Sequence, residues 1–412
     1  GNGDHQGSGR VGGDGVMAKV KDIAMQIRGV SYHPEDLHDN LDEDSVVLLR
    51  ANNIKDGKLI LDDVVYVSKS KVAEQQYLQT GDILICASSG SKELVGKAAF
   101  VDSVKNPMTF GAFCKVVRPQ PEYSEYLGHY FNSPVYRRKI SALSAGANIN
   151  NIKNEHIDNL DIQLVDEKER REIITILNEL NMLISLRKQQ LFKLDELVKA
   201  RFVEMFGDSV ANTKNFPSTT LETVMTVFPQ NGLYKPQTDY VQDDTGIPIL
   251  RIDAFYNGKV TNWNTLKRLI CAETEIDRYL LRENDIVINR VNSIEYLGKC
   301  AHIVGLKEKT VFESNMMRFH MDEKKVNAVY VTEVLCTEDI YRQILRRAKK
   351  SVNQASINQE DVKSLEILVP PLSLQNQFAA FVERVYRQKQ TVQQSLEKLE
   401  LMKKALMQEY FG

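Results

Sequence analysis

Two segments of the chain carry apolar residues at alternating spacings of three and four. In the first segment the apolar positions are Ile173, Leu177, Leu180, Ile184, Leu191, Leu194 and Val198. In the second they are Phe378, Val382, Val385, Val392, Leu396, Leu399 and Leu406. This spacing predicts two coiled-coil helices whose contacts are made by the a and d positions of a heptad. A helix of about 40 residues spans roughly 60 Å, which is too long to pack on one small domain alone.

We expect the two helices to pair with each other, and to run antiparallel because a globular segment separates them in the sequence. The alternative is that each helix lies independently on its own domain, but the heptad pattern continues over about five heptads in both copies. Three polar residues interrupt the apolar positions, and we expect them to fix the helix register: Arg187, Lys389 and Lys403. Asp166 with Glu169 offers a capping box for the first helix, and Pro370-Pro371 fixes the start of the second.

The helices belong to a longer internal repeat. Residues 148–207 and 353–412 align without a gap at an offset of 205, and matching blocks recur upstream at 81–85 with 284–288 and at 94–97 with 296–299. The segments between those blocks, 86–92 and 289–294, do not match. A repeated scaffold with one divergent loop suggests one fold that recognises two different targets, although drift of a surface loop is the commoner cause of divergence.

Short apolar runs separated by Gly, Asn-Gly and Asp-Gly turns predict that both globular parts are mixed α/β (α+β). The predicted strands are Val46–Leu49, Ile83–Cys86, Ala98–Val101 and Phe113–Val117, then Ile249–Ile252, Ile286–Asn289, Cys300–Val304 and Met317–His320. Helical stretches are expected at Glu122–Leu143 and Asn327–Lys350. The predicted organisation is a leader or disordered tail (1–16), module 1 (17–165), a long helix (166–211), module 2 (212–370) and a second long helix (371–412).

Composition limits the chemistry that the chain can perform. The net charge is −2, and the five cysteines include no CxxC pair, so we expect reduced thiols in a cytoplasmic protein and no zinc site. No signal peptide or membrane-length apolar run is present. The Asn-Pro-Pro-Tyr type of tetrad that amino-methyltransferases use is absent, as are a Gly-x-Ser-x-Gly motif and a recognisable magnesium motif. The sequence therefore predicts no catalytic or metal site.

The order of module, long helix, module, long helix resembles the specificity subunit of type I restriction–modification systems. The resemblance rests on the block Gly81–Ile85, the Leu-Gly-Lys blocks, the Asn-rich turns before Ile152 and Ile357, the segment 365–372, and the Phe-Gly endings of both repeats. It covers nearly the whole chain from about Met17. One difference is that residues 163–166 read Gln-Leu-Val-Asp where residues 368–371 read Leu-Val-Pro-Pro.

The resemblance implies that each module is a target-recognition domain for half of a split double-stranded DNA sequence, and that the helices set the spacer. It also implies that two methyltransferase subunits, which bind S-adenosylmethionine, dock on the chain, and that a motor endonuclease subunit can join them. The chain itself would be non-catalytic, with no cofactor and no membrane contact. Two alternatives stay open at this point: a single-chain DNA methyltransferase or endonuclease, and a coiled-coil adaptor without a role on DNA.

Residue chemistry and position nominate the DNA contacts. Arg and Lys can bind guanine edges, Asn and Gln can bind adenine edges, and all four can reach phosphates. For any one of them a solvated surface role is at least as common. The candidates in module 1 are Arg50, Asn52, Asn53, Ser88, Ser89, Lys92, Arg137, Arg138, Asn148 and Asn150. Those in module 2 are Arg251, Asp253, Asn289, Arg290, Asn292, Arg346, Lys349, Lys350, Asn353 and Gln354.

Overall fold

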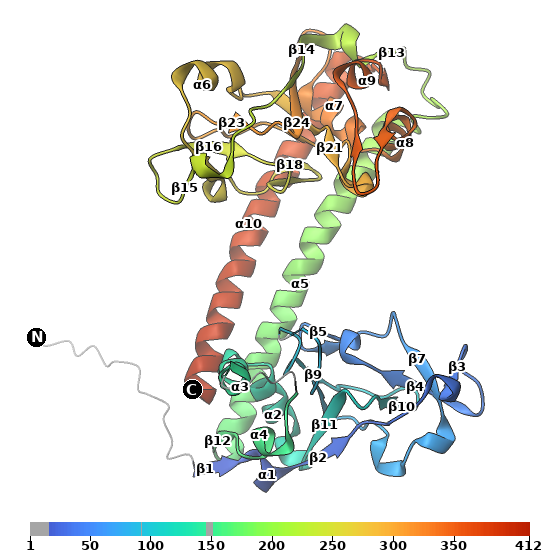
Figure 1. Ribbon diagram of the computed structural model, residues 1–412, viewed down its shortest axis with the longest axis vertical. Helices are drawn as coiled ribbons and strands as arrows, with labels where there is room; N and C mark the ends of the chain where they lie inside the picture. The colour runs from blue at the N-terminus through green and yellow to red at the C-terminus, as the bar shows by residue number, and fades with distance from the viewer. Residues whose placement is uncertain (1–15, 92, 146–150) are drawn as a thin grey trace, which may run out of the picture. The chain divides into compact units, whose positions relative to one another are not determined.

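The computed structural model describes residues 16–91, 93–145 and 151–412. The predicted leader lies outside these residues except for Val16, which begins strand β1 (Val16–Lys19) and therefore belongs to the fold. The chain divides into two compact units, residues 1–189 with 393–412 (unit 1) and residues 190–392 (unit 2). Each unit contains one globular module together with part of each long helix (Figure 1).

Unit 1 is built on two four-stranded sheets. One has the order β2-β11-β8-β9 and is antiparallel; the other has the order β10-β4-β7-β3, with β10 parallel to β4. The strands are β2 (Ala24–Arg28), β3 (Leu37–His38), β4 (Ser45–Leu49), β5 (Ile54–Lys55), β6 (Lys58–Leu59), β7 (Val65–Ser68), β8 (Ile83–Cys86), β9 (Ala98–Phe100), β10 (Met108–Phe110), β11 (Cys114–Pro119) and β12 (Asp161–Leu164). The helices of the module are α1 (Val20–Ile23), α2 (Ser124–Phe131), α3 (Pro134–Ala145) and α4 (Asn154–Asp158).

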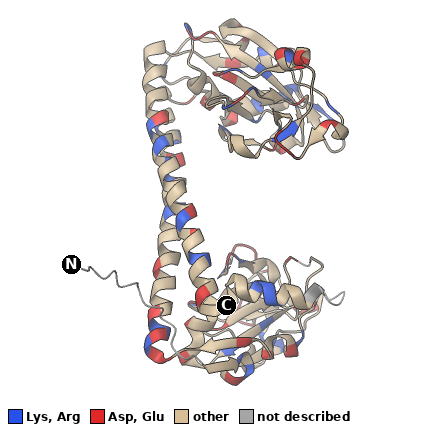
Figure 2. Ribbon diagram, turned by 90° about the vertical axis from the view of Figure 1, so that its left-hand side faces the viewer, with Lys and Arg blue, Asp and Glu red and all other residues tan. Residues whose placement is uncertain are grey.

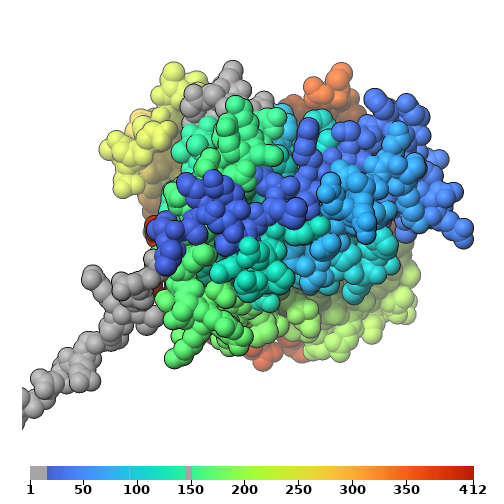
Figure 3. All heavy atoms as spheres, turned by 90° about the horizontal axis from the view of Figure 1, so that it is seen from below, coloured from blue at the N-terminus to red at the C-terminus, as the bar shows by residue number. Residues whose placement is uncertain are grey.

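The module is closed by β1, which pairs antiparallel with β12 immediately before the first long helix. On the face of unit 1 seen in Figure 3, the first described segments (blue) accordingly lie against the end of the module and the start of the helix (green).

Unit 2 repeats this strand order. The order β14-β24-β20-β22 corresponds to β2-β11-β8-β9, the order β23-β16-β19-β15 corresponds to β10-β4-β7-β3, and β13 pairs with β27 as β1 pairs with β12. The strands are β13 (Ser218–Thr220), β14 (Met225–Asn231), β15 (Tyr240–Val241), β16 (Ile247–Leu250), β17 (Phe255–Tyr256), β18 (Gly258–Val260), β19 (Lys267–Leu269), β20 (Asp285–Asn289), β21 (Val291–Asn292), β22 (Cys300–His302), β23 (Val311–Phe312), β24 (Met316–Met321), β25 (Lys349–Lys350), β26 (Ala355–Ser356) and β27 (Glu366–Leu368). The helices are α6 (Glu273–Tyr279), α7 (Ala328–Leu335), α8 (Glu338–Arg347) and α9 (Gln359–Lys363). The modules are two copies of one fold.

The long helices are α5 (Glu167–Phe206) and α10 (Leu372–Phe411). In unit 1, Ile173 near the start of α5 shares a core with Phe411 at the end of α10. In unit 2 the relation is reversed, because Phe206 at the end of α5 shares a core with Phe378 near the start of α10. The helices therefore pair antiparallel within each unit, which confirms the predicted antiparallel pair.

Polar contacts accompany the apolar positions of the helix pair. In unit 1, the Nε of Arg187 donates to the Oγ of Ser395 at 3.2 Å, and in unit 2 the Nζ of Lys389 donates to Asp195 at 2.5 Å. Burial lowers the pKa of Lys403, the third polar residue of the pattern. Figure 2 shows Lys and Arg interspersed with Asp and Glu along both helices.

Side-chain caps define the helix starts. At the start of α5, Oδ1 of Asp166 accepts the amide hydrogen of Glu169 at 2.8 Å, as the predicted cap requires. At the start of α10, the fully buried Gln375 donates to the Pro370 carbonyl at 2.7 Å and accepts from the amide of Asn327 at 2.9 Å. The second contact ties α10 to module 2 ahead of α7.

Each of the two shorter predicted helical stretches is in fact two helices. Pro134 begins α3 after a break that separates it from α2, because proline is favoured in a first turn but lacks the amide hydrogen that a continuing helix needs. Thr337 separates α7 from α8, where its side chain accepts from the amide of Ile340. Lys349 and Lys350, predicted to end the second stretch, form the short strand β25 instead. Within the described residues, no helix is both long enough and apolar enough to cross a membrane.

A buried ion pair anchors the start of the central strand in each module. The guanidinium of Arg118 on β11 makes two 2.8 Å contacts with the carboxylate of Asp82, directly before β8. In unit 2, Asp285 receives Arg318 at 3.1 Å and His320 at 2.9 Å. Each aspartate also caps the turn before its strand, where Asp82 accepts the Gln79 amide at 2.8 Å. The predicted turn-shaping role of the two aspartates is confirmed.

Candidate nucleic-acid interface

Segments that are distant in sequence meet where the central strand of module 1 ends. After β8, the amides of Ala87 and Ser88 both donate to the carbonyl of Phe113, at 2.9 and 3.0 Å. The carbonyl of Ala87 accepts the amide of Ile152 at 2.7 Å, and that of Leu49 accepts the amide of Gly111 at 2.9 Å. We call residues 29–32, 49–53, 87–91, 111–113 and 151–152 the loop cluster of module 1.

Module 2 makes the same backbone contacts with different side chains. The amides of Arg290 and Val291 donate to the carbonyl of Asn315 at 2.8 and 3.3 Å, and the carbonyl of Arg290 accepts the amide of Ile357 at 2.9 Å. The carbonyl of Leu250 accepts the amide of Glu313 at 3.0 Å. The loop cluster of module 2 therefore contains residues 232–235, 250–253, 290–293, 313–315 and 349–357.

One glycine in each cluster is required by close packing of two backbones. A Cβ on Gly29 would lie 2.1 Å from the carbonyl oxygen of Gly111, and a Cβ on Gly232 would lie 2.2 Å from that of Glu313. Any other residue would push the loop after β2 or β14 away from the turn before β11 or β24. The two modules thus share both the hydrogen bonds and the steric constraint that hold the loops together.

In module 2 the structure brings together candidates from two segments that are distant in the sequence. Strands β21, β26 and β25 form a small antiparallel sheet with β26 in the middle. Ala355 on β26 pairs with Asn292 on β21 and, across its other edge, with Lys350 on β25. The candidates gathered there are Arg290, Asn292, Lys349, Lys350, Asn353 and Gln354. Lys349, Lys350, Asn353 and Gln354 are exposed, so this sheet presents basic and amide side chains at the surface. Arg346 is also exposed, on the last turn of α8.

In module 1 several candidates are engaged within the protein. Arg50 and Asn52 both donate to one oxygen of the exposed Asp63, at 3.2 and 2.7 Å, so they lie together at the surface. The guanidinium of Arg137 donates to the carbonyls of Val95 and Glu93, which holds the segment directly after the divergent loop. Arg138 donates to Gln408 on α10, and Ser88 and Ser89 are half-buried in the loop cluster. The remaining candidates of module 1 lie outside the described residues: Lys92, Asn148 and Asn150.

Two candidates are in the wrong environment for DNA contact. Asn53 is only 1% exposed and donates both amide hydrogens to the carbonyls of Ile60 and Asp63, so it shapes the loop from within. Asn289 is fully buried and directs its amide toward the carbonyl of Tyr296. A side chain without solvent exposure cannot reach a base or a phosphate, so we withdraw these two predictions.

A buried carboxylate orients Arg251, another candidate. Glu313 accepts the amide of Ile252 at 2.7 Å and lies 3.7 Å from the Nε of Arg251, while burial raises the pKa of Glu313. The guanidinium also lies 5.7 Å from the ring centre of Tyr240, and Asp253 lies 3.9 Å from its Nε. Arg251 is thus held from several sides at the edge of the cluster, a fixed geometry suited to directional hydrogen bonding.

Comparison with known proteins follows the same division of the chain. The family described as type I restriction modification DNA specificity domain matches residues 19–196 and again residues 216–401. The chain belongs to this family. The two matches cover both modules and most of both long helices, so the internal repeat of the sequence is a repeat of the specificity domain.

Relatives in the specificity family resemble the chain over most of its length. It is 31% identical over 397 residues to the type I restriction enzyme EcoKI specificity subunit of Escherichia coli (strain K12), covering 92% of this chain and 84% of the relative. It is also 31% identical to the StySPI specificity subunit of Salmonella potsdam, with the same coverage. A crystal structure of the type I S subunit from M. genitalium shares the fold, with a TM-score of 0.57 and 12% identity, covering 98% of each chain. The predicted family is confirmed, and the enzyme and adaptor alternatives gain no support.

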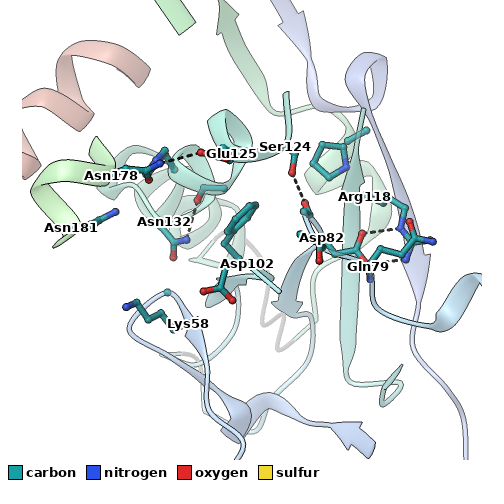
Figure 4. Close-up of a pocket in the computed structure, with 18 of the residues that line it drawn as sticks. Lys58, Gln79, Asp82, Asp102, Arg118, Ser124, Glu125, Asn132, Asn178 and Asn181 are labelled. Atoms are coloured by element: carbon teal, nitrogen blue, oxygen red, sulfur yellow. Dashed lines mark hydrogen bonds and ion pairs between the residues drawn. The ribbon is translucent and has the colours of Figure 1, made fainter. Parts of the chain in front are cut away.

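A groove of this specificity-domain protein lies elsewhere in unit 1. An open groove of about 1420 Å³ is bounded by β9, α2 and the unit 1 parts of both long helices. Its wall contains five basic residues (Lys21, Lys58, Arg118, Lys188, Lys403) and five acidic ones (Asp22, Asp56, Asp82, Asp102, Glu125). Figure 4 shows that several of these groups bond to one another or to backbone, as in the contact of Asn178 with Glu125 at 3.1 Å. With balanced charge, the groove offers no field that would attract a polyanion.

Among the described residues, no group of three or more His, Cys, Asp or Glu side chains could hold a metal ion. The free thiols among them are mostly buried, and burial raises the pKa of Cys86 and of Cys114, the latter to about 12. A thiol with so high a pKa carries almost no thiolate at neutral pH and is a poor nucleophile. Because the loop clusters bring candidate residues from distant segments together, they are the candidate functional surfaces of both modules.

Proposed function

We propose that the chain is the DNA-recognition subunit of a type I restriction–modification system and that it reads a bipartite duplex target with one module per half-site. The observation that carries this proposal is the pair of loop clusters. Their backbone hydrogen bonds are equivalent in the two modules, whereas the side chains that they present differ. One scaffold with two sets of side chains is suited to reading two different half-sites.

The paired helices would set the distance between the half-sites. Each is 40 residues long, so each spans on the order of 60 Å. Cross-helix contacts such as Lys389 with Asp195 specify one register, because a shift of either helix would separate them. A fixed register is what a device that sets a spacer of defined length requires.

Methyltransferase subunits, two in number, are the proposed partners, and they would supply S-adenosylmethionine and the methylation of adenine. The unit 1 part of α5 carries exposed apolar side chains that a partner helix could cover: Met182 and Leu186, one helical turn apart, are 58% and 50% exposed. A motor endonuclease subunit would join this core in systems that have one. The chain itself would make no covalent change to DNA.

The proposal is tested by expressing the chain with its methyltransferase subunit and sequencing the methylated sites of the host DNA. We expect one bipartite target. Replacing residues 17–165 with the corresponding module of a relative should then change one half of the target and leave the other half intact. If both halves change together, the modules are not independent readers. The purified chain alone, incubated with labelled S-adenosylmethionine and duplex DNA, should transfer no methyl group.

A further inference from the structure

One position in the loop cluster is geometrically equivalent in the two modules and chemically opposite. The carbonyl of Phe113 accepts the amides of Ala87 and Ser88, and the carbonyl of Asn315 accepts those of Arg290 and Val291. Both residues are the last of a two-residue turn, directly before β11 and β24 respectively. The backbone position is therefore the same, and only the side chain differs.

Both side chains are available to a ligand. Phe113 is 70% exposed although it is a large apolar residue with a buried neighbour on its C-terminal side, Cys114. The side-chain amide of Asn315 is half-buried and has no hydrogen-bond partner among the described residues. The Phe113 ring is exposed in the loop cluster, so contact with a partner would remove a large apolar area from water. The alternation of apolar residues predicts a strand through Phe113, but the ring lies in the turn before β11.

We infer that residues 113 and 315 are paired specificity-determining positions: Phe113 makes an apolar contact with a base of one half-site, and Asn315 hydrogen-bonds to a base edge of the other. In the major groove an apolar side chain favours the thymine methyl group, and an asparagine amide matches the N6 and N7 pair of adenine. The neighbours support this assignment. The amide of Ser88 donates to the carbonyl of Phe113, and the amide of Arg290, whose guanidinium can also bind a base edge, donates to the carbonyl of Asn315.

This inference rests on the proposed function, and its test separates the two. The protein is assembled with its methyltransferase subunits, and binding is measured on duplexes that carry the target methylated by the unaltered complex, with each base pair varied in turn. If the unaltered complex shows no sequence preference, the proposed function fails. If it does, the substitutions Phe113→Ala and Asn315→Ala then test the inference alone.

We expect Phe113→Ala to lose discrimination about tenfold or more at one base pair of the half-site read by module 1, with the other half-site unchanged. Asn315→Ala should do the same in the second half-site, and Phe113→Asn should shift the preferred base and not merely weaken binding. Phe228→Ala removes an equally large ring that is 54% exposed on β14, outside both clusters, and should leave every preference unchanged. Equal weakening on all sequences, or no change in preference with Phe113→Ala, would overturn the inference.

Discussion

The last aromatic residue of each long helix completes the core of one unit, and this arrangement gives a sharp stability prediction. Phe206 is 3% exposed and its ring lies 4.6 Å from that of Tyr330 in unit 2. Phe411 is 6% exposed and its ring lies 5.2 Å from that of Tyr126 in unit 1. The Phe-Gly endings that mark the repeat are therefore core residues of different units.

Replacing either phenylalanine with alanine removes a buried ring and leaves a cavity. Such substitutions cost about 3–5 kcal/mol in a packed core. Phe411 is 6% exposed and Phe206 is 3% exposed, so we expect about 3 kcal/mol for Phe411→Ala and a value nearer the upper figure for Phe206→Ala. For a unit of roughly 200 residues, 1 kcal/mol shifts Tm by about 2–4 °C, so Phe411→Ala should lower it by roughly 6–12 °C.

The assay can resolve the two units because the chain has one tryptophan, Trp263, which lies in unit 2. Phe206→Ala should lower the midpoint of the Trp263 fluorescence transition and speed amide exchange in α7. Phe411→Ala should instead speed amide exchange in α2 of unit 1. The matched controls Val203→Ala and Leu401→Ala remove exposed side chains from the same two helices and should change stability by less than about 0.5 kcal/mol. Faster exchange in α7 but not in α2 for Phe411→Ala would refute the assignment of the helix ends.

Three further predictions concern titration, base contact and spacing. Burial lowers the pKa of His129 and of His302 to about 4, so between about pH 4 and 6.5 the unfolded chain binds more protons than the folded one. The free energy of unfolding should therefore fall as the pH drops through that window, and urea unfolding of His129→Gln should show a shallower fall. An unchanged dependence of the free energy of unfolding on pH would contradict this. Arg290→Ala should weaken binding to the specific target by about 1–3 kcal/mol if it reads guanine, whereas equal weakening on all sequences would assign Arg290 to phosphate contact. Inserting four residues after Arg187 in α5, and four more directly before its partner Ser395 in α10, lengthens the helix pair by about 6 Å. Methylation should then shift to targets whose spacers are one or two base pairs longer. Methylation of the original spacer alone would show that the helices do not set the spacer length.

Periodicity and repetition predicted the elements that depend on local pattern. The predicted long helices start at residues 166 and 371, one residue before α5 and α10, and β8 has the predicted bounds. The first long helix was wrongly extended to residue 211, because α5 ends at Phe206, before Gly207 with a φ of 75°. The prediction of one helical stretch over Glu122–Leu143 was wrong, because this segment forms two helices with a break before Pro134. The spacing of apolar residues continues through the break and therefore does not reveal it.

The sequence predicted the residues of the candidate site less well than it predicted the fold. Asn53 and Asn289 have the right chemistry and lie near the right strands, but the sequence does not say whether an amide faces solvent or supports its own loop. Phe113 was missed because an apolar residue beside a strand usually continues that strand. The signal that could have found it is the repeat itself: the equivalent position holds Asn315, and a change from apolar to polar at one position of a repeat argues against burial in both copies.

The physical arrangement of each module explains how the two surfaces can differ while the fold stays the same. The segments of the loop cluster are joined by backbone amides and carbonyls, so most of its side chains can change without loss of these bonds; Gly29 and Asn53 are exceptions. The buried ion pair of Arg118 with Asp82 lies at the opposite end of β8 from the cluster, about 13 Å away for a four-residue strand. Substitutions among residues 87–91 or at Phe113 therefore leave that buried ion pair intact. The buried ion pair and the proposed recognition surface therefore lie at opposite ends of the same strand, an arrangement that would allow one scaffold to carry two specificities in one chain.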